Sequence, residues 1–422
     1  MIKVDISNIW GVLSLSDLLG IEAELSAAHM AVTDTGWMEL PDRSPTAEHM
    51  RLLAAAHRIR ENSDALVVVS ADGAGLGARA VIELLQGANR NLRCSKGDPM
   101  LLWAGADLST RGWNELARLL EGRDFSLCVI SRTGDDLESA VAFRNLRWML
   151  ERRFGTAQAK RRIYAVTHRE EGLLRHMAEE EGWESFALPE DAPDCFGVLS
   201  PAGLLPMAAA GVDVMALLRG AAQMKAEGDL RSFENPVWLY AAVRELMRRR
   251  GRTAELMESF EPDFASMGRW WQRLSAGTGG GLYPAFGELT GQLPVLSRLL
   301  REGDPGIFET MLRFGPPARR AVILEDVWDP DGLNYLAGRK LDELEEQLWQ
   351  SAMADHSDSG CPVVAVECGP VNEQTMGALI WFFQLSCVLS AGVRGVDPFD
   401  RSGIDGFRRE LFARLGRPGL EA

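Results

Sequence analysis

Residues 65–86 read ALVVVSADGAGLGARAVIELLQ and contain, in one stretch, the signals of an α/β unit. The run 66–69 is short, rich in β-branched residues and flanked by residues that break regular structure, which is typical of a buried parallel strand. A turn with Gly73, Gly75 and Gly77 follows, and the apolar residues after it have helical spacing. The stretch therefore predicts a strand, a turn and a helix in succession.

The same order of strand and helix recurs through the first half of the chain. Short apolar runs lie in MLLWAG, SLCVISR, RIYAVTH and SFALP, and helical patterns separate them. Strands that alternate with helices of about ten to fifteen residues form right-handed βαβ units and a parallel sheet. Further strands are expected at RAVILED, residues 320–326, and PVVAVECG, residues 362–369. The predicted fold class is α/β, with two doubly wound parallel-sheet lobes packed together with extra helices.

The 422 residues are enough for two or three packed domains. We expect an N-terminal helical segment over residues 1–44, a first α/β lobe over 45–185, and a second lobe with the C-terminal helices over 186–422. Thr46 has the residue type and the position of a helix N-cap. In open α/β sheets, ligands bind at the carboxyl ends of strands, which here carry the loops SADGAGLG and SRTGDD.

Charge and composition exclude several classes of function. The formal net charge is -15, from 60 acidic against 45 basic residues, which argues against affinity for nucleic acid or an anionic membrane surface. The N-terminus lacks a basic region followed by a long apolar run, and no uninterrupted apolar stretch of about 18 residues occurs. Six cysteines and six histidines are dispersed without metal-ligand spacing. We therefore expect no metal, no disulfide and a cytoplasmic protein.

The glycine turn could also mark a dinucleotide site, but the rest of that pattern is missing. The pattern needs an acidic residue about 20 positions further on, at the end of a second strand. That part of the chain reads GANRNLRCSKG, residues 87–97. Nicotinamide binding is therefore not expected.

Several segments resemble one known family in the same order along the chain. The loops VVVSADGAGLGARAVIELLQ and SLCVISRTGDDLESAVAFRNLRWMLERRFG resemble the glycine loop and the phosphate loop of bacterial glucose-6-phosphate isomerases. Further matching segments are CFGVLSPAGLLPMAAAGVDV, NPVWLYAAVRELMRRRG, LNYLAGRKLDE and GVRGVDPFDRSGIDGFRRELFARLGRPG. The resemblance covers most of the chain, and it implies two sugar-isomerase (SIS) subdomains.

The resemblance also implies a chemistry. The family interconverts an aldose 6-phosphate and a ketose 6-phosphate by ring opening and proton transfer between C1 and C2, without a cofactor. A carboxylate moves the proton, and an arginine stabilises the enediolate. Hydroxyl groups and backbone N–H groups at helix N-termini hold the phosphate. The implied partners are a sugar phosphate and a second copy of the chain in a homodimer, with no nucleic acid and no membrane.

Carried over position by position, the resemblance implies that the phosphate-binding residues are altered. The family's glycine loop has a serine in a Gly-Gly-Ser run, matched here by Asp72, Gly73 and Ala74. Its phosphate loop reads Ser-Lys-Ser/Thr-Gly-Thr-Thr-x-Glu, where this chain has SRTGDDLE. Two threonines are thus replaced by carboxylates, which repel a phosphate dianion. The substrate positions in this loop are Ser131, Arg132, Thr133, Asp135 and Asp136.

The positions of the family's catalytic groups are altered as well. The enediolate-stabilising arginine is matched by Cys195, and the ring-opening histidine by Pro294. The loop of the family's catalytic glutamate contains no carboxylate here, and Glu288 lies beyond it. Late in the chain, Arg401 and Arg408 replace a glutamine and a lysine. Arginine can hold an oxyanion but is a poor proton donor.

Three candidates for catalysis remain: Glu288, Arg408 and His356. His356 matches a family position, although a surface or capping role is more common for a histidine in a segment such as ADHSDSG. The resemblance implies an isomerase of glucose 6-phosphate and fructose 6-phosphate, of glycolysis and gluconeogenesis, with activity that is weak or lost. A retained or shifted isomerase would use Glu288, Arg132 and Arg408. The alternative is a catalytically silent paralogue that acts as a binding, sensing or partner-modulating subunit.

The altered phosphate site has a predicted occupant. In the family, the second threonine of the phosphate loop and the glutamine of the Phe-Asp-Gln run contact the same phosphate. These positions hold Asp136 and Arg401 here. A carboxylate and a guanidinium that converge on a phosphate-sized gap can form a bidentate pair. We therefore predict that Arg401 pairs with Asp136 or Asp135 and fills the phosphate position.

Overall fold

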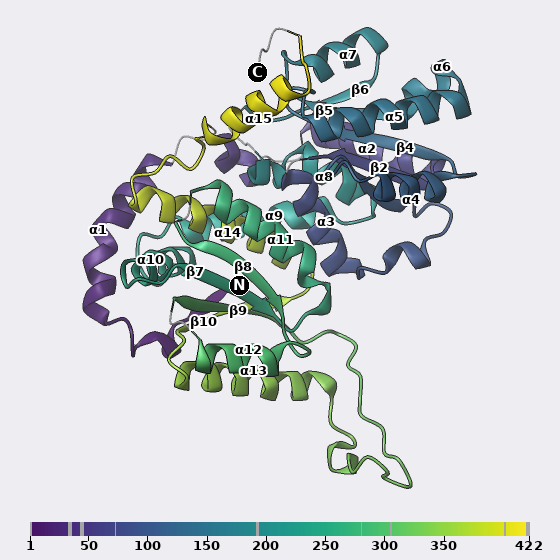
Figure 1. Ribbon diagram of the computed structural model, residues 1–422. Coiled ribbons are helices and arrows are strands. Elements are labelled where there is room, and N and C mark those ends of the chain that lie inside the picture. The colour runs from purple at the N-terminus through teal and green to yellow at the C-terminus, as the bar shows by residue number, and fades with distance from the viewer. Residues whose placement is uncertain are drawn as a thin grey trace.

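The structure is a computed structural model with two α/β lobes that pack side by side (Figure 1). It describes residues 2–32, 36–42, 46–71, 73–190, 194–279, 281–303, 306–400 and 402–418, without the side chains of 402–405. Arg401 and Asp72 lie outside the described residues.

The first lobe contains a five-stranded sheet in which all strands are parallel. Its strand order is β3-β2-β4-β5-β6, so the chain proceeds in opposite directions on the two sides of β2. A ligand site is expected at the carboxyl edge near such a reversal of strand order. The apolar runs of the sequence predict this sheet correctly. Its strands are β2 (Ala65–Ser70), β3 (Met100–Ala104), β4 (Phe125–Ile130), β5 (Ile163–Thr167) and β6 (Glu184–Ala187).

Helices cover both faces of this sheet. The predicted cap at Thr46 is confirmed, because its hydroxyl accepts the backbone N–H of His49 at the start of α2. Helix α3 begins at Gly73, so Gly73, Gly75 and Gly77, which were expected in a turn, lie in the helix instead. The helices of this lobe are α2 (Ala47–Asn62), α3 (Gly73–Gln86), α4 (Thr110–Leu120), α5 (Leu137–Phe154), α6 (Thr156–Ala159) and α7 (Leu173–Glu181), with 3-10 turns η3 (Arg90–Arg93) and η4 (Lys160–Arg162).

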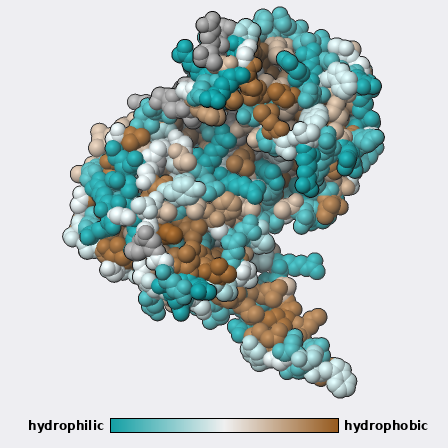
Figure 2. All heavy atoms as spheres, viewed as in Figure 1, coloured by the Kyte–Doolittle hydropathy of each residue, from teal (hydrophilic) through white to brown (hydrophobic). Residues whose placement is uncertain are grey.

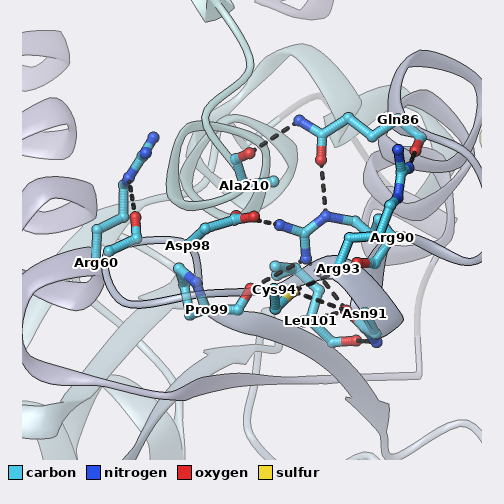
Figure 3. A network of polar contacts seen from close by, with 11 residues as sticks. Arg60, Gln86, Arg90, Asn91, Arg93, Cys94, Asp98, Pro99, Leu101 and Ala210 are labelled. Carbon is cyan, nitrogen blue, oxygen red and sulfur yellow. Dashed lines mark hydrogen bonds and ion pairs between the residues drawn. The ribbon is translucent and has the colours of Figure 1, made fainter.

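The segment between α3 and β3 is held by one buried arginine, Arg90 (Figure 3). Its guanidinium donates to Asp98 at 2.5 Å, to Gln86 at 2.7 Å and to the carbonyl of Pro99 at 3.0 Å. Gln86 also donates to the carbonyl of Ala210 at 2.9 Å, which ties the segment to the second half of the chain. The segment that lacked the dinucleotide pattern is therefore a structural connection.

The second lobe has a mixed five-stranded sheet in the order β1-β10-β9-β7-β8. Four strands are parallel, and β1 pairs antiparallel with β10 at the edge. The N-terminal segment is therefore not purely helical as expected, because it supplies an edge strand to the second lobe. The strands are β1 (Lys3–Asp5), β7 (Ala254–Ser259), β8 (Tyr283–Glu288), β9 (Ile307–Gly315) and β10 (Val363–Pro370).

The expected strand at RAVILED is wrong. In that run only Val322 forms an isolated bridge, with Lys340, and Leu324 is 85% exposed. The run belongs to an arm, residues 316–340, that extends from the second lobe into solvent (Figure 1). An apolar run without burial partners gains nothing from strand pairing inside the sheet, so the pattern alone was misleading.

Helix α14 (Glu373–Val393) is the central helix of the second lobe and packs against α1, α9 and α10. It is long and apolar enough to cross a membrane by length and composition, but 83% of its apolar window is buried inside the protein. Its neighbours include α1 (Leu15–Ala31), α9 (Val214–Gly228), α10 (Pro236–Arg249) and α11 (Ala265–Gly277), whereas α8 (Pro201–Ala209) packs against α2 and α3.

The remaining helices lie at the margins of the second lobe. Helices α12 (Leu293–Glu302) and α13 (Leu341–Asp358) pack together on one side of its sheet (Figure 1). The C-terminal helix α15 (Ser402–Arg414) reaches the first lobe. Short 3-10 turns complete the chain: η1 (Ser7–Ile9), η2 (Gly36–Asp42), η5 (Asp194–Leu199), η6 (Pro262–Phe264) and η7 (Asn334–Leu336).

Candidate functional site between the lobes

The loop after β4 forms a closed network of hydrogen bonds at the N-terminus of α5. The backbone N–H of Gly134 donates to Ser131 Oγ at 2.9 Å, and the Ser131 hydroxyl donates to Asp136 Oδ2 at 2.7 Å. Gly134 has a φ of 85°, and a Cβ there would lie 2.5 Å from the backbone nitrogen of Leu174. This glycine is therefore required by the shape of the loop.

Both aspartates of this loop face arginines from the C-terminal segment. Arg408 of α15 donates to Asp136, and Arg417 lies 3.7 Å from Asp135. Thr133 donates its hydroxyl to Asp135 at 2.5 Å. The predicted partner of Asp136 was Arg401, which lies outside the described residues. Among the residues that are described, the partner of Asp136 from this segment is Arg408.

Arg132 contributes to the local structure of the loop. Its guanidinium donates to the carbonyls of Pro189 and Glu190, each at 3.1 Å. Its own carbonyl accepts the hydroxyl of Thr167 at 3.1 Å. Arg132 therefore ties the loop after β4 to the segment after β6.

A second internal carboxylate lies at the N-terminus of α3. The backbone N–H of Gly73 donates to Asp194 in η5, and Arg273 of α11 donates to the same carboxylate at 2.9 Å. Asp194 has a φ of 46°, in the left-handed region that a non-glycine residue seldom adopts. A Cβ at Gly73 would clash with Cys195 Sγ, so only glycine allows this approach. The amide that opens α3 thus binds the protein's own carboxylate.

Around these groups lies a hollow of about 110 Å³ between the lobes. It is lined by acidic, basic and apolar side chains from η5, α11, the turn 398–400 and α15. Cys195 lies at its wall but is only 2% exposed, and Ala74 is equally buried. Its lining includes Asp194, which pairs with Arg273, and Arg408, which pairs with Asp136 beside the hollow.

The structure does not bring the three candidates for catalysis together. Arg408 lines the hollow. Glu288 ends β8 with an exposed side chain and is not among the described residues that line the hollow. His356, in the last turn of α13, is completely buried against the second sheet, where it contacts Glu309 and Ser297. The expected surface position of His356 is therefore wrong, because its imidazole is part of the core of the second lobe.

Sequence reasoning missed three residues of this site. Asp194 directly precedes Cys195, and no local pattern marks it as the partner of a distant amide. Arg273 lies outside the matched segments, and Arg417 lies near the end of the last one. Their roles depend on which side chains the fold brings together. The only signal in the sequence is the number of aspartates in the loops, which indicates that basic partners lie nearby.

Comparison with known proteins identifies the family. No family model matches the chain. A glucose-6-phosphate isomerase of Bacillus cytotoxicus is 35% identical over 437 residues, covering 100% of this chain and 97% of the relative. A glucose-6-phosphate isomerase of Bacillus cereus is 36% identical over 393 residues, covering 92% of this chain and 87% of the relative.

Solved structures agree on the fold. A hypothetical protein of Thermus thermophilus superposes with a TM-score of 0.85 at 20% identity, over 98% of this chain and 100% of that one. A glucose-6-phosphate isomerase of Chlamydia trachomatis superposes with a TM-score of 0.78 at 14% identity, over 94% of this chain and 84% of that one. With its two α/β lobes and its sequence identity to the Bacillus enzymes, the chain belongs to the glucose-6-phosphate isomerase family.

Proposed function

We propose that this chain is a glucose-6-phosphate isomerase homologue whose isomerisation of glucose 6-phosphate and fructose 6-phosphate is weak or lost. One observation carries the proposal: internal carboxylates lie at the N-termini of both α3 and α5. A helix N-terminus at the edge of such a sheet is a natural site for a phosphate group. Here Asp194 and Asp136 already supply the negative charge.

A phosphate dianion would meet two costs in this hollow. It would have to displace a carboxylate from its amide or arginine partner, and it would then lie beside that displaced charge. Two like charges at 4 Å repel by about 4 kcal/mol at an effective dielectric constant near 20. The arginines Arg273 and Arg408 cannot offset this cost fully, since each is already paired.

Among the described residues that line the hollow, we also identify no base for the proton-transfer step. The shift of a proton between C1 and C2 needs a carboxylate or another base within hydrogen-bond reach of the substrate carbon. Asp194 and Asp136 are acceptors in ion pairs, and Glu288 is exposed to solvent at the end of β8. The described part of the site supports recognition of a small polar molecule better than enediolate chemistry.

This arrangement favours the silent form of the protein, a binding or partner-modulating subunit that acts in the cytoplasm. We propose that its partner is a second copy of the chain. The arm 316–340 exposes large apolar side chains, and Figure 2 shows hydrophobic atoms along the part of it nearest the lobe. Contiguous exposed apolar surface marks interaction sites. The exposed side chains are those of Val322, Leu324, Val327, Trp328, Leu333 and Tyr335.

Calorimetric titration with fructose 6-phosphate tests the loss of substrate binding. We expect a dissociation constant weaker than about 10 µM, which corresponds to less than roughly 7 kcal/mol of affinity. The matched control is the same titration with a Bacillus relative. Tighter binding than this limit would show that the hollow accommodates a sugar phosphate, and the proposal would then be wrong.

Sedimentation of the full chain tests the second copy. We expect a dimer at micromolar concentration, and a monomer for the double variant L324S/W328S, because the two exposed side chains would no longer be buried in the contact. Residues Leu108 and Leu173 are also exposed but lie in the first lobe, so L108S/L173S should remain dimeric. A monomeric wild type would contradict the proposed dimer. The proposed loss of sugar-phosphate binding would be unaffected.

A further inference from the structure

Three potential metal ligands meet inside the second lobe, away from the hollow between the lobes. Glu258 lies on β7, Glu309 on the neighbouring strand β9, and His356 in the last turn of α13. All three side chains are completely buried. One ligand atom from each lies within 4.8 Å of the corresponding atoms of the other two. Three elements of the fold thus converge on one point between the sheet and α13.

The histidine is held in the orientation that a metal ligand requires. His356 Nδ1 lies 2.8 Å from Glu309 Oε2, and its Nε2 lies 2.8 Å from Ser297 Oγ on α12. In the tautomer that donates its Nε2 proton to the serine hydroxyl, the Nδ1 lone pair faces the carboxylate. Histidines that bind metals are commonly fixed in this way by an outer hydrogen bond through the second nitrogen.

The carboxylates lack the partners that burial demands. Among the described residues, no hydrogen-bond partner reaches either oxygen of Glu258 or the Oε1 atom of Glu309. A buried charge without a partner costs several kcal/mol, so such groups are paired, protonated or bound to a cation. The nearby Arg301 donates to Asp355 and is 60% exposed, so it does not supply that cation. Two buried carboxylates therefore face one imidazole.

A glycine on the neighbouring strand keeps a side chain away from Glu258. Gly287 on β8 lies next to it, and a Cβ there would stand 3.3 Å from Glu258 Oε1. A divalent ion would supply the positive charge that these buried carboxylates lack.

We infer that Glu258, Glu309 and His356 form a binding site for a divalent transition-metal ion, of the Zn²⁺ or Mn²⁺ type. One imidazole nitrogen and two carboxylates are the ligand set that such ions accept, with water completing the coordination. The ion would neutralise both carboxylates and would join β7, β9 and α13. The site is separate from the hollow between the lobes and independent of its activity.

Calorimetric titration of the full chain with ZnCl₂, after removal of metal with a chelator, tests the inference. We expect one Zn²⁺ per chain, and heats that depend on the buffer because protons are released on binding. The variant E258Q keeps the shape of the side chain and should weaken binding roughly 100-fold or more, since one ligand loses its charge. H356Q should weaken binding to a similar extent.

A double variant controls for binding at the surface. His57 with Glu61 and His176 with Glu180 form exposed pairs that could take up zinc, so H57Q/H176Q should bind Zn²⁺ like the wild type. Circular dichroism and thermal unfolding in chelator establish that each variant is folded. Stoichiometric binding that E258Q leaves unchanged, or that H57Q/H176Q abolishes, would overturn the inference. Failure of the folded wild type to bind Zn²⁺ or Mn²⁺ below about 10 µM would also overturn it.

Discussion

The two faces of the second sheet bury glutamates in contrasting surroundings. Glu255 and Glu258 lie on the same strand, β7, and their side chains point to opposite faces, because successive residues of a strand alternate. Glu255 faces α10, where Arg244 donates to it at 2.7 Å and Tyr240 at 2.5 Å. Glu258 faces Glu309 without any such donor among the described residues. One face satisfies its carboxylate internally, and the other requires a proton or an ion.

The satisfied face shows what a buried carboxylate needs. Thr310 adds a third donor to Glu255 at 2.9 Å, and Arg244 is itself held by Ser275 at 2.6 Å. Both members of the ion pair are almost completely inaccessible to solvent. Such a network is complete in itself, and its stability depends on every member. Glu258 has no corresponding set among the described residues, and this difference predicts opposite responses to the same kind of substitution.

We expect the largest effect on stability from the face of the sheet that carries Glu255. The variant R244M removes the cation and leaves Glu255 buried and uncompensated. We expect the free energy of unfolding to fall by about 3–5 kcal/mol. Urea denaturation of the chelator-treated protein measures it. The matched control is R298M, which breaks the exposed Arg298–Glu302 pair and should change stability by less than about 1 kcal/mol. Equal losses of unfolding free energy in R244M and R298M would show that the buried ion pair stabilises the protein no more than the exposed one.

The next effect compares one substitution on both faces. E255Q leaves Arg244 without its counter-ion and should destabilise the protein by about 3 kcal/mol. E258Q in metal-free protein removes an unpaired buried carboxyl group and should stabilise it by about 1–3 kcal/mol. Chemical denaturation in chelator at neutral pH gives both values. If E255Q and E258Q lowered the free energy of unfolding by similar amounts, Glu258 would have a partner equivalent to Arg244. The two faces of the sheet would then not differ.

The hollow between the lobes offers an intermediate case, in which paired carboxylates lie at a surface. The variant D194G frees Arg273 and the backbone N–H of Gly73, and it also relieves the positive φ at position 194. We expect affinity for inorganic phosphate to rise roughly tenfold, about 1.4 kcal/mol. Calorimetry with phosphate measures it, and R298M again serves as the control. Unchanged affinity would show that Asp194 does not occupy an anion site.

The smallest effect concerns a buried histidine that is satisfied only when neutral. Trp238 Nε1 donates to His29 Nδ1 at 2.9 Å, and burial lowers the pKa of His29 below its usual range. Arg231 lowers this pKa further, while Asp229 opposes the shift. Because the unfolded chain takes up the proton first, stability is lost as pH falls through about 6.5.

We expect this loss to be about 1 kcal/mol between pH 7 and pH 5.5, since one proton is worth roughly 1.4 kcal/mol per pH unit. Unfolding free energies at several pH values measure the slope. The variant H29Q should be less stable at pH 7 but should lack this component of the slope. An identical slope in both proteins would contradict the assignment to His29.

Much of the first lobe could be predicted from sequence, whereas most of the second sheet could not, although β10 was expected at PVVAVECG. Its strands β7 and β9 carry Glu255, Glu258 and Glu309, and these charged residues interrupt the apolar runs that reveal a buried strand. The exposed run RAVILED led to the opposite error, because its apolar pattern predicted a strand where the structure has none. The buried glutamates that hid the strands are the same residues that now distinguish the two faces.

For the candidate site, the sequence predicted that an aspartate would pair with an arginine, but it did not predict which residues meet. The aspartates of the loop after β4 were expected to find an arginine, and the described partner of Asp136 is Arg408, further along the chain than Arg401. Asp194 at the N-terminus of α3 was missed, because its importance depends on the close approach of Gly73. Contacts between segments far apart in the chain have no local signal in a single sequence.

A coupled assay that converts fructose 6-phosphate to glucose 6-phosphate, run beside a Bacillus relative, measures the proposed loss of isomerisation itself. We expect kcat/KM at least about 10³-fold below that of the relative, because carboxylates lie at the N-termini of α3 and α5, where the proposal expects the phosphate. Both proteins should be folded by circular dichroism. A kcat/KM within about tenfold of the relative would contradict the proposed loss of activity and would show that this hollow supports isomerisation.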